Sequence, residues 1–401
     1  MVNLEKINNL AQNLYLEHIE LPSIFLGEGV INEITNYVKL KEFKHITFVV
    51  DNNTYKAAGE RIKSNVINEG IKAHVVVLTD NEHQQVIADE QTLVELFTKT
   101  PKNTDVYIAV GAGTIHDITR FCAYYMKLPF ISVPTASSVD GFTSKGAPVI
   151  LKGVKKTLQT SSPLAVFADT HILARSPKEL TAAGFGDIIA KYTSLLDWKI
   201  SAWIGNEPYN QQAAEITKDA LLLCVDHREE IESCSSYGLE ILMRALIESG
   251  LVMLLLDYSR PASGAEHHLS HYWEMSLLKD DKKQLLHGAK VGVASTIIID
   301  EYKNKLATKS VDSFIGTTLE KQLTQHWGEI KTLLDDLPSA AEVAKMLSFV
   351  HGPSTVEELG LEKQLVLESL QQAHTLRERC TGLFLLNTLS NHDNRMLGYE
   401  L

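Results

Sequence analysis

The first half of the chain alternates short runs of β-branched and apolar residues with helical patterns. Five such runs stand at residues 45–50, 74–78, 105–110, 129–133 and 165–168, and each ends at a polar or glycine-containing turn. This alternation predicts a parallel sheet covered by helices. Because ligands of such sheets bind beyond the carboxyl ends of the strands, we expect functional residues at that edge.

The strand pattern disappears after about residue 175. Apolar residues then recur at helical spacing, as in residues 211–232 and 239–256, and breaks are expected at Gly238, 261–264 and 351–354. The second half is therefore predicted to be all-helical.

The length of 401 residues exceeds what one hydrophobic core usually organises, so two domains are expected. No linker rich in Gly, Ser or Pro separates the halves. We predict an α/β fold with a parallel-sheet domain at 1–174, an all-helical domain at 175–401, and a cleft between them.

The composition is that of a soluble globular enzyme, with 44% hydrophobic and 22% charged residues. A formal net charge of -12 argues against binding to nucleic acid or to an anionic membrane, because phosphates demand clustered Lys and Arg. A small anionic substrate is still compatible with a local positive pocket.

The four cysteines are scattered without a CxxC pair, which favours free thiols in a reducing cytoplasm. The N-terminus lacks signal-peptide features, and the most apolar run, 251–256, is too short to span a bilayer. We expect a cytoplasmic protein without stable membrane insertion.

A turn of small residues, Gly111-Ala-Gly-Thr-Ile-His-Asp117, follows a predicted strand and opens a helix. Backbone N–H groups and a positive helix end can approach a pyrophosphate there, although a plain tight turn is the alternative. The next strand ends in residues 134–144, rich in small hydroxyl side chains. Two such loops can clasp one nucleotide; helix N-capping is the alternative for Thr135 and Ser137.

Asp51 closes the run 45–50. Its carboxylate can accept hydrogen bonds from a ribose diol and would repel a 2′-phosphate, which favours NAD(H) over NADP(H). The alternative is a turn-forming Asp before Asn52 and Asn53.

Asp187, His267, His271 and His287 carry the metal hypothesis. Two neutral nitrogens and one oxygen suit Zn²⁺ or another first-row divalent ion and leave positions open for substrate. His267 and His271 are one helical turn apart and face the same way, whereas His268 projects about 100° away and cannot share that direction.

Each residue also has a structural alternative. His268 alone is more readily interpreted as a core histidine, Asp187 as a helix N-cap after Gly186, and His287 as a histidine at the C-terminus of a helix before Gly288. The combination with an upstream nucleotide loop favours a metal site.

Five motifs occur in order at residues 111–117, 134–144, 184–191, 266–271 and 287–288. Together they resemble the metal-dependent polyol and alcohol dehydrogenases that share the dehydroquinate-synthase fold, and within them the sn-glycerol-1-phosphate dehydrogenases. The resemblance implies an N-terminal Rossmann-like domain and a C-terminal helical domain, with metal, nicotinamide and substrate meeting in the cleft.

The resemblance also implies the roles of single residues. It assigns metal ligation to Asp187, His267 and His287, and substrate contact to Asp140, Asp187 and His271. The implied nucleotide contacts, for NAD(H) or NADP(H), are Asp51, Gly111, Gly113, Thr114, Ile115, His116, Asp117, Thr135, Ala136, Ser137, Ser138 and Ser144.

Two positions depart from related enzymes. Ala112 stands where many have a third glycine, and Lys191 stands where iron-type alcohol dehydrogenases have a further metal histidine. A lysine in place of the histidine removes a metal ligand and adds a cation. The missing ligand favours a metal held by three residues, and the added cation favours a phosphorylated substrate. Lys191 is therefore a candidate catalytic residue. Lys145 is a second candidate cation for the phosphate, or else a structural lysine.

The resemblance implies reversible NAD(P)-dependent reduction of dihydroxyacetone phosphate to sn-glycerol 1-phosphate, with one Zn²⁺ or Ni²⁺, in a homodimer serving glycerophospholipid-type synthesis. His271 is the candidate for moving the substrate proton, with an orienting role as the alternative. Competing hypotheses are a glycerol or secondary-alcohol dehydrogenase on the same scaffold and a catalytically inert nucleotide-binding regulator.

Overall fold

A six-stranded parallel sheet organises the first part of the computed structural model, which describes residues 2–16 and 19–396. Its strand order is β1-β8-β5-β4-β2-β3. The strands are β1 (Ser23–Gly27), β2 (His45–Val50), β3 (Lys72–Val77), β4 (Val106–Gly111), β5 (Phe130–Pro134) and β8 (Ala165–Asp169). The predicted parallel sheet is confirmed; β1 was missed.

The sheet is buried on both faces. Phe48 and Val50 pack with residues of α2 and α4, whereas Val49 and Tyr107 pack with residues of α5 and α6 on the opposite face. Side chains alternate along a strand, so a run with apolar residues at every position fits a sheet covered on both sides. The helical elements before β8 are α1 (Leu4–Asn13), η1 (Val30–Glu33), α2 (Ile34–Leu40), α3 (Asn52–Thr54), η2 (Tyr55–Gly59), α4 (Glu60–Asn68), α5 (Glu90–Lys99) and α6 (Gly113–Met126).

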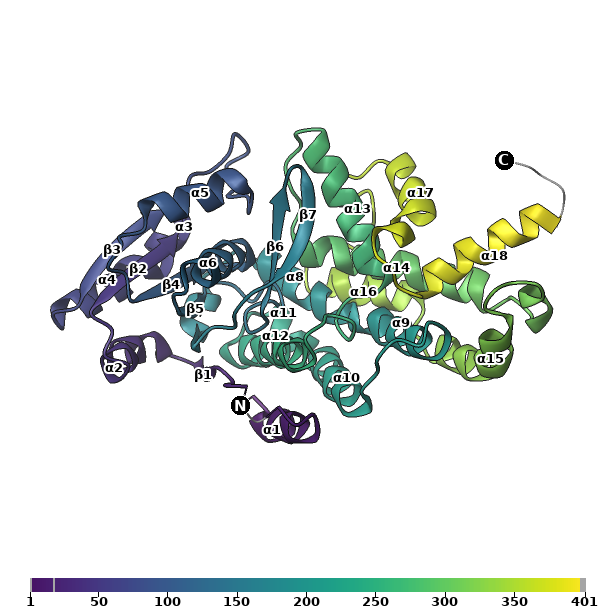
Figure 1. The fold of residues 1–401 in the computed structure, drawn as a ribbon, viewed down its shortest axis with the longest axis horizontal. Helices are drawn as coiled ribbons and strands as arrows, with labels where there is room; N and C mark the ends of the chain where they lie inside the picture. Colours follow the sequence, from purple (N-terminus) through teal and green to yellow (C-terminus); the bar gives the residue numbers. More distant parts are fainter. Residues whose placement is uncertain (1, 17–18, 397–401) are drawn as a thin grey trace.

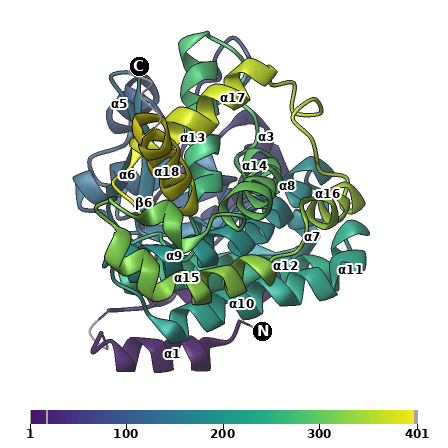
Figure 2. The same cartoon turned by 90° about the vertical axis from the view of Figure 1, so that its right-hand side faces the viewer.

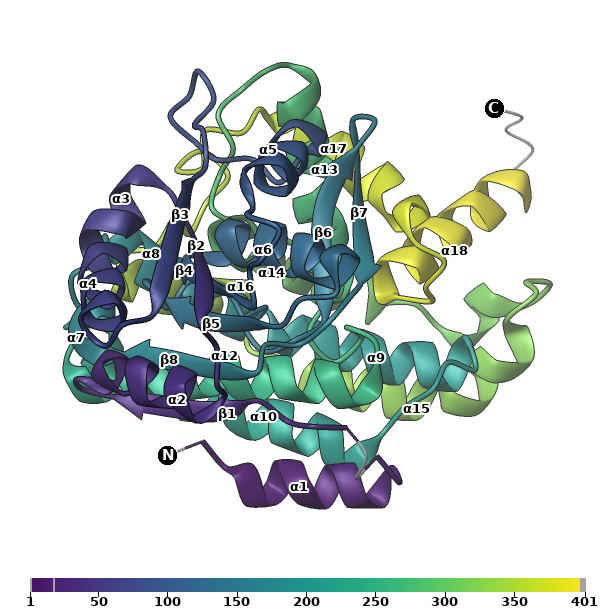
Figure 3. The same cartoon turned by 60° about the vertical axis from the view of Figure 1, so that its left-hand side comes forward.

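An antiparallel hairpin of β6 (Gly146–Leu151) and β7 (Val154–Gln159) is inserted between β5 and β8. Lys152 and Gly153 form its turn with φ of 53° and 72°, the left-handed pair that suits a two-residue hairpin. The hairpin stands between the sheet and the later helices (Figures 1 and 3). The sequence pattern does not predict this hairpin, because β7 is mostly polar.

After β8 the described chain is helical, as predicted (Figures 1 and 2). The helical elements are α7 (Thr170–Leu173), α8 (Lys178–Ile189), α9 (Lys191–Ile204), α10 (Gln211–Asp226), α11 (Arg228–Glu232), α12 (Ser236–Leu256), α13 (Ala265–Lys279), α14 (His287–Glu301), η3 (Tyr302–Leu306), η4 (Val311–Phe314), α15 (Glu320–Asp335), α16 (Ala340–Phe349), α17 (Lys363–Gln372), η5 (Ala373–Leu376) and α18 (Gly382–Met396). Within the described ranges, no helix has the length and apolarity needed to cross a membrane.

The predicted helix break at Gly238 is wrong. The chain breaks before Ser236, and Gly238 lies in the first turn of α12, where an added Cβ would stand 2.0 Å from the Glu230 carbonyl oxygen. Glycine is there for close packing and not for a turn. The predicted stretch 211–232 is also interrupted, at His227, while the breaks at 261–264 and 351–354 are confirmed.

The N-terminal helix α1 packs against α10 and α12, and Lys6 Nζ lies 2.6 Å from Asp219 Oδ2. The division into domains at residues 1–174 and 175–401 stays a prediction.

Candidate functional site

Asp187, His267 and His287 converge from three helices, α8, α13 and α14. One ligand atom from each lies within 4.8 Å of the other two. His267 Nε2 is 4.0 Å from Asp187 Oδ1, and the rings of His267 and His287 have centroids 5.2 Å apart. The three atoms leave a gap of the size that a divalent ion fills, and the two-nitrogen, one-oxygen set matches its chemistry.

The two capping alternatives are wrong. Asp187 lies inside α8, near its C-terminal end, and does not cap a helix start; His287 is the first residue of α14 and does not end a helix. Asp187 Oδ2 instead accepts the backbone N–H of Asp140 at 3.0 Å, which ties α8 to the loop after β5.

Glu266 fixes the orientation of His267. Its Oε1 lies 2.8 Å from His267 Nδ1 and accepts the N–H of Gly264, while Oε2 accepts the Thr193 hydroxyl at 2.7 Å. Burial alone would raise the pKa of Glu266, but these hydrogen bonds, first that with His267, hold it below its ordinary value. Because the carboxylate occupies Nδ1, Nε2 of His267 is left to bind an ion. This orienting role of Glu266 was not predicted from the sequence, although Glu266 directly precedes His267.

Helices α8 and α14 approach closely at glycines. An added Cβ on Gly288 would stand 1.8 Å from the Ala183 carbonyl oxygen, and one on Gly186 would stand 2.4 Å from the Gly288 carbonyl oxygen. Only glycine permits this backbone contact. The contact brings the Asp187 and His287 side chains to one place.

Lys191 lies fully buried beneath the ligand set. Its Nζ donates to Asp140 Oδ2 at 2.7 Å, Asp187 Oδ1 at 3.2 Å and the Ala262 carbonyl at 3.3 Å, so all three ammonium protons have acceptors. Burial would lower the pKa of Lys191, but the two carboxylates outweigh it and raise the pKa above its ordinary value. Ser249 donates to the same Asp140 oxygen at 2.8 Å.

His271 borders the same cavity as His267 and His287. Its ring centroid is 6.2 Å from that of His267, as expected for two histidines one turn apart on α13. It is 6.3 Å from the ring centroid of His287 on α14. Burial, and next the Lys155 cation, lower the pKa of His271 well below its ordinary value. His268 is buried away from the ligand set.

The N-terminus of α6 opens into this cavity of about 340 Å³. Gly113, Thr114, Asp117, Ser138 and Ser144 line it, as does Asp140. The sheet edge predicted from the two loops thus borders the same cavity as His267 and His287, and Asp187 has a ligand atom within 4.8 Å of those of the two histidines.

The other predicted nucleotide residues hold the loops. An added Cβ on Gly111 would stand 2.6 Å from Ile115, whose side chain is buried in the core. His116 borders the cavity, but Nδ1 lies 2.9 Å from the Ala112 carbonyl and Nε2 lies 2.8 Å from Ser132 Oγ. Burial lowers the pKa of His116 to about 3, so the ring is neutral.

Thr135, Ala136 and Ser137 are buried, do not line the cavity, and cap no described helix. Asp51 follows β2 and caps α3, its Oδ1 accepting the N–H groups of Asn53 and Thr54 at 2.8 and 2.7 Å. The turn-forming alternative for Asp51 therefore describes its local structure.

Arg120 is a buried cation that sequence analysis missed. It donates to the carbonyls of Gly141 and Gly146 and lies 3.3 Å from Asp117. These contacts tie the loop after β5 to α6. A charged residue on an otherwise apolar helix face was the available signal.

A family model described as iron-containing alcohol dehydrogenase matches residues 25–177. A glycerol-1-phosphate dehydrogenase (NAD(P)+) of Geobacillus thermodenitrificans is 45% identical over 96% of this chain and 97% of its own. The glycerol-1-phosphate dehydrogenase of Bacillus subtilis is 44% identical over 93% of this chain and 94% of its own. The enzyme of Methanosarcina barkeri is 30% identical over 91% of this chain and 91% of its own.

Among solved structures, a glycerol dehydrogenase from Schizosaccharomyces pombe superposes with a TM-score of 0.68 at 18% identity, covering 96% of this chain and 93% of its own. A 1,3-propanediol oxidoreductase superposes with a TM-score of 0.67 at 15% identity, covering 93% of this chain and 98% of its own. These two likenesses establish the fold.

Proposed function

This chain belongs to the glycerol-1-phosphate dehydrogenase family, and from that premise we propose that the cavity between the sheet edge and helices α13 and α14 is its active site. The chain is an NAD(P)-dependent oxidoreductase. Oxidation of the secondary alcohol of glycerol 1-phosphate gives dihydroxyacetone phosphate, and reduction runs the reverse way.

Asp187, His267 and His287 hold the divalent ion in this proposal. The observation that carries it is the approach of their ligand atoms to within 4.8 Å, with Glu266 fixing the tautomer of His267. Zn²⁺ and Ni²⁺ both suit these donors. When bound, the ion polarises the C2 carbonyl as a Lewis acid and reduced nicotinamide supplies the hydride.

The coenzyme lies at the carboxyl edge of the sheet. The N-terminus of α6 at Gly113 and Thr114 faces the cavity and favours a pyrophosphate there. Ser138 and Ser144 offer hydroxyls from the loop after β5. Asp51 would accept from the adenosine ribose, and it favours NAD(H) over NADP(H). The two loops are shaped by the remaining predicted nucleotide residues, which are Gly111, Ile115, His116, Thr135, Ala136 and Ser137.

Within the active site, His271 moves the proton at the C2 oxygen, and Asp140 contacts a substrate hydroxyl. Both border the cavity. Lys191 acts through Asp187 and Asp140, because its three donors are already engaged. It positions the ligand carboxylate and neutralises charge beneath the ion.

The purified protein tests the proposal when NADH oxidation is followed with dihydroxyacetone phosphate and with unphosphorylated dihydroxyacetone. We expect metal-dependent turnover that strongly prefers the phosphorylated ketone, and chiral analysis to identify sn-glycerol 1-phosphate. Equal or better turnover of dihydroxyacetone would favour the glycerol dehydrogenase alternative. We also expect a homodimer, which light scattering checks.

A further inference from the structure

A cluster of charges lines the cavity next to His271. Lys155 on β7 and Lys290 on α14 both bind Glu274 on α13, with nitrogen-to-oxygen distances of 2.7 and 2.8 Å. Lys290 is 1% exposed, and the other two side chains are 14% exposed. Two cations share one carboxylate, so the group keeps one net positive charge facing the cavity.

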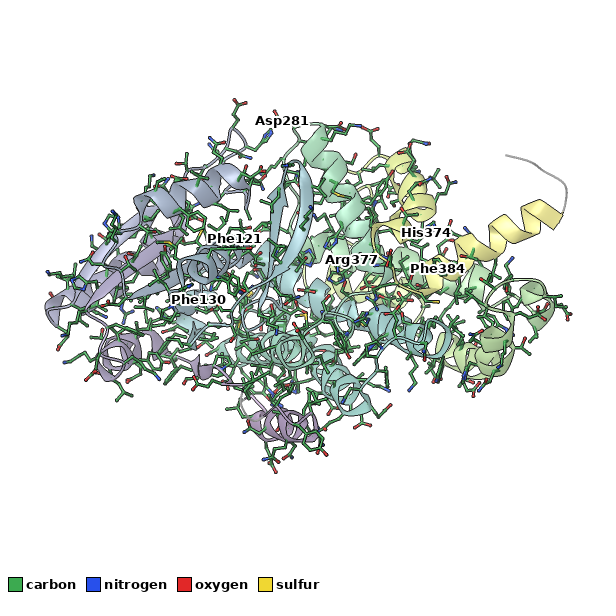
Figure 4. The ribbon with its side chains drawn as sticks, viewed as in Figure 1. Phe121, Phe130, Asp281, His374, Arg377 and Phe384 are labelled. Atoms are coloured by element: carbon green, nitrogen blue, oxygen red, sulfur yellow. The ribbon has the colours of Figure 1, made fainter. Side chains whose placement is uncertain are left out.

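Arg377, labelled in Figure 4, lies between η5 and α18. It lines the same cavity. In the described part of the chain no carboxylate forms an ion pair with it; Arg379, two residues on, lies near Glu207 instead. Burial, and next the Arg379 cation, lower the pKa of Arg377. A half-buried guanidinium without an anion is costly, unless a ligand supplies the negative charge.

His271 lies close to both this cluster and the metal residues. Lys155, Arg377 and Glu274 act on its ring electrostatically, and so does His267. Lys145, the other cation at this cavity that sequence analysis named, is paired with Asp257 at 2.9 Å. The cations of this cavity that carboxylates do not fully neutralise are therefore Lys155, Lys290 and Arg377.

We propose that Arg377, with Lys155 and Lys290, binds the phosphate of the substrate and determines the preference for a phosphorylated ketone. Three cations and Glu274 leave two net positive charges, which match a phosphate monoester of charge about -1.5 to -2 near neutral pH. The planar guanidinium suits bidentate contact with phosphate oxygens. The inference rests on the proposed function and names the residues behind its substrate class.

Arg377→Met tests the inference, with the exposed Arg175→Met as the matched control. We expect kcat/KM for dihydroxyacetone phosphate to fall about ten- to hundredfold, mainly through KM, as for loss of a charged hydrogen bond. The KM for NADH and the metal content stay unchanged, and kcat/KM for dihydroxyacetone falls much less than that for dihydroxyacetone phosphate. Arg377→Lys restores part of the loss, because it keeps the charge without the bidentate geometry.

Binding of inorganic phosphate gives a readout independent of turnover. Phosphate should raise the Tm of the wild type and inhibit competitively with dihydroxyacetone phosphate, and Arg377→Met should lose both effects. If Arg377→Met does not fold, Lys155→Met on the hairpin repeats the measurements.

Retention of the full preference for dihydroxyacetone phosphate in the folded variants would overturn the inference. A rise confined to the KM for NADH would also overturn it and assign the cations to the coenzyme. A wild type that shows no preference for the phosphorylated ketone would instead contradict the proposed function itself.

Discussion

At the scale of single residues, the proposed metal site depends on ligand side chains that are held by tertiary contacts and cap no helix. Asp187 and His287 make no capping hydrogen bond, and Glu266 occupies the second nitrogen of His267. A buried carboxylate beside two imidazoles, with Lys191 bound to the same carboxylate, offers one oxygen and two nitrogens to a cation.

Removal of a ligand should abolish metal retention. We expect Asp187→Ala or His287→Ala to lose the bound ion and turnover while NADH binding persists, because the nucleotide loops belong to other elements. Elemental analysis and NADH fluorescence titration measure the two effects. The exposed His351→Ala should behave as wild type, and near-normal turnover of a metal-free Asp187→Ala would contradict the site.

Glu266→Gln should weaken the metal without removing it. The amide keeps the size of the carboxylate but lacks its charge, and loss of an orienting carboxylate typically lowers metal affinity about ten- to hundredfold. Competition with a chelator of known affinity measures the change. An unchanged affinity would mean that His267 is oriented by packing alone.

His271→Ala should lower turnover and preserve the ion, because its ring lies beside the ligand set and outside it. Parallel kinetics and elemental analysis separate these effects. A metal-free His271→Ala would place this histidine among the ligands.

The sequence predicted candidate site residues whose type or motif indicates a function. It did not predict the contacts between residues that only the folded chain brings together. The motif of His267 and His271 and the loop 111–117 stand out in the chain by composition. Glu266 and Arg377 look like ordinary surface charges until tertiary contacts place them, and Arg120 stands out only as a charge on an otherwise apolar helix face. Lys191 was noticed, but only the structure shows that its three donors are engaged.

At the scale of elements, the geometry of the site depends on the contact between α8 and α14. Strand runs of apolar residues predicted the sheet because burial on both faces leaves an unmistakable pattern. The hairpin β6–β7 and the edge strand β1 escaped because neither has a continuous buried run.

Gly288→Ala tests that contact. The new methyl would stand 1.8 Å from the Ala183 carbonyl, so α14 must shift from α8, at a cost of about 1–3 kcal/mol and with weaker metal binding. Gly328→Ala in α15 has no atom within 4 Å and should instead stabilise by about 0.5–1 kcal/mol. Urea unfolding compares the two variants, and a neutral Gly288→Ala would refute the close contact.

At the scale of the whole molecule, the ion would connect helices far apart in the chain. Chelation should therefore lower the Tm, since a ligand present at about a thousandfold excess over its Kd stabilises by about 4 kcal/mol. Calorimetry with and without chelator measures the shift, and Zn²⁺ or Ni²⁺ should reverse it. Asp187→Ala should show no response; an equal shift in that variant would locate the ion elsewhere.

The β6–β7 hairpin forms a sheet of its own, packs on α6 and α13, and is joined to Asp89 by an isolated bridge at Ile150. Its tip, anchored by the Lys152 N–H on Glu90, can therefore be lengthened, shortened or exchanged without re-registering any strand of the six-stranded sheet. Enzyme engineers who want a bulkier phosphorylated ketone accepted have, in this one appendage, a natural site for grafting libraries.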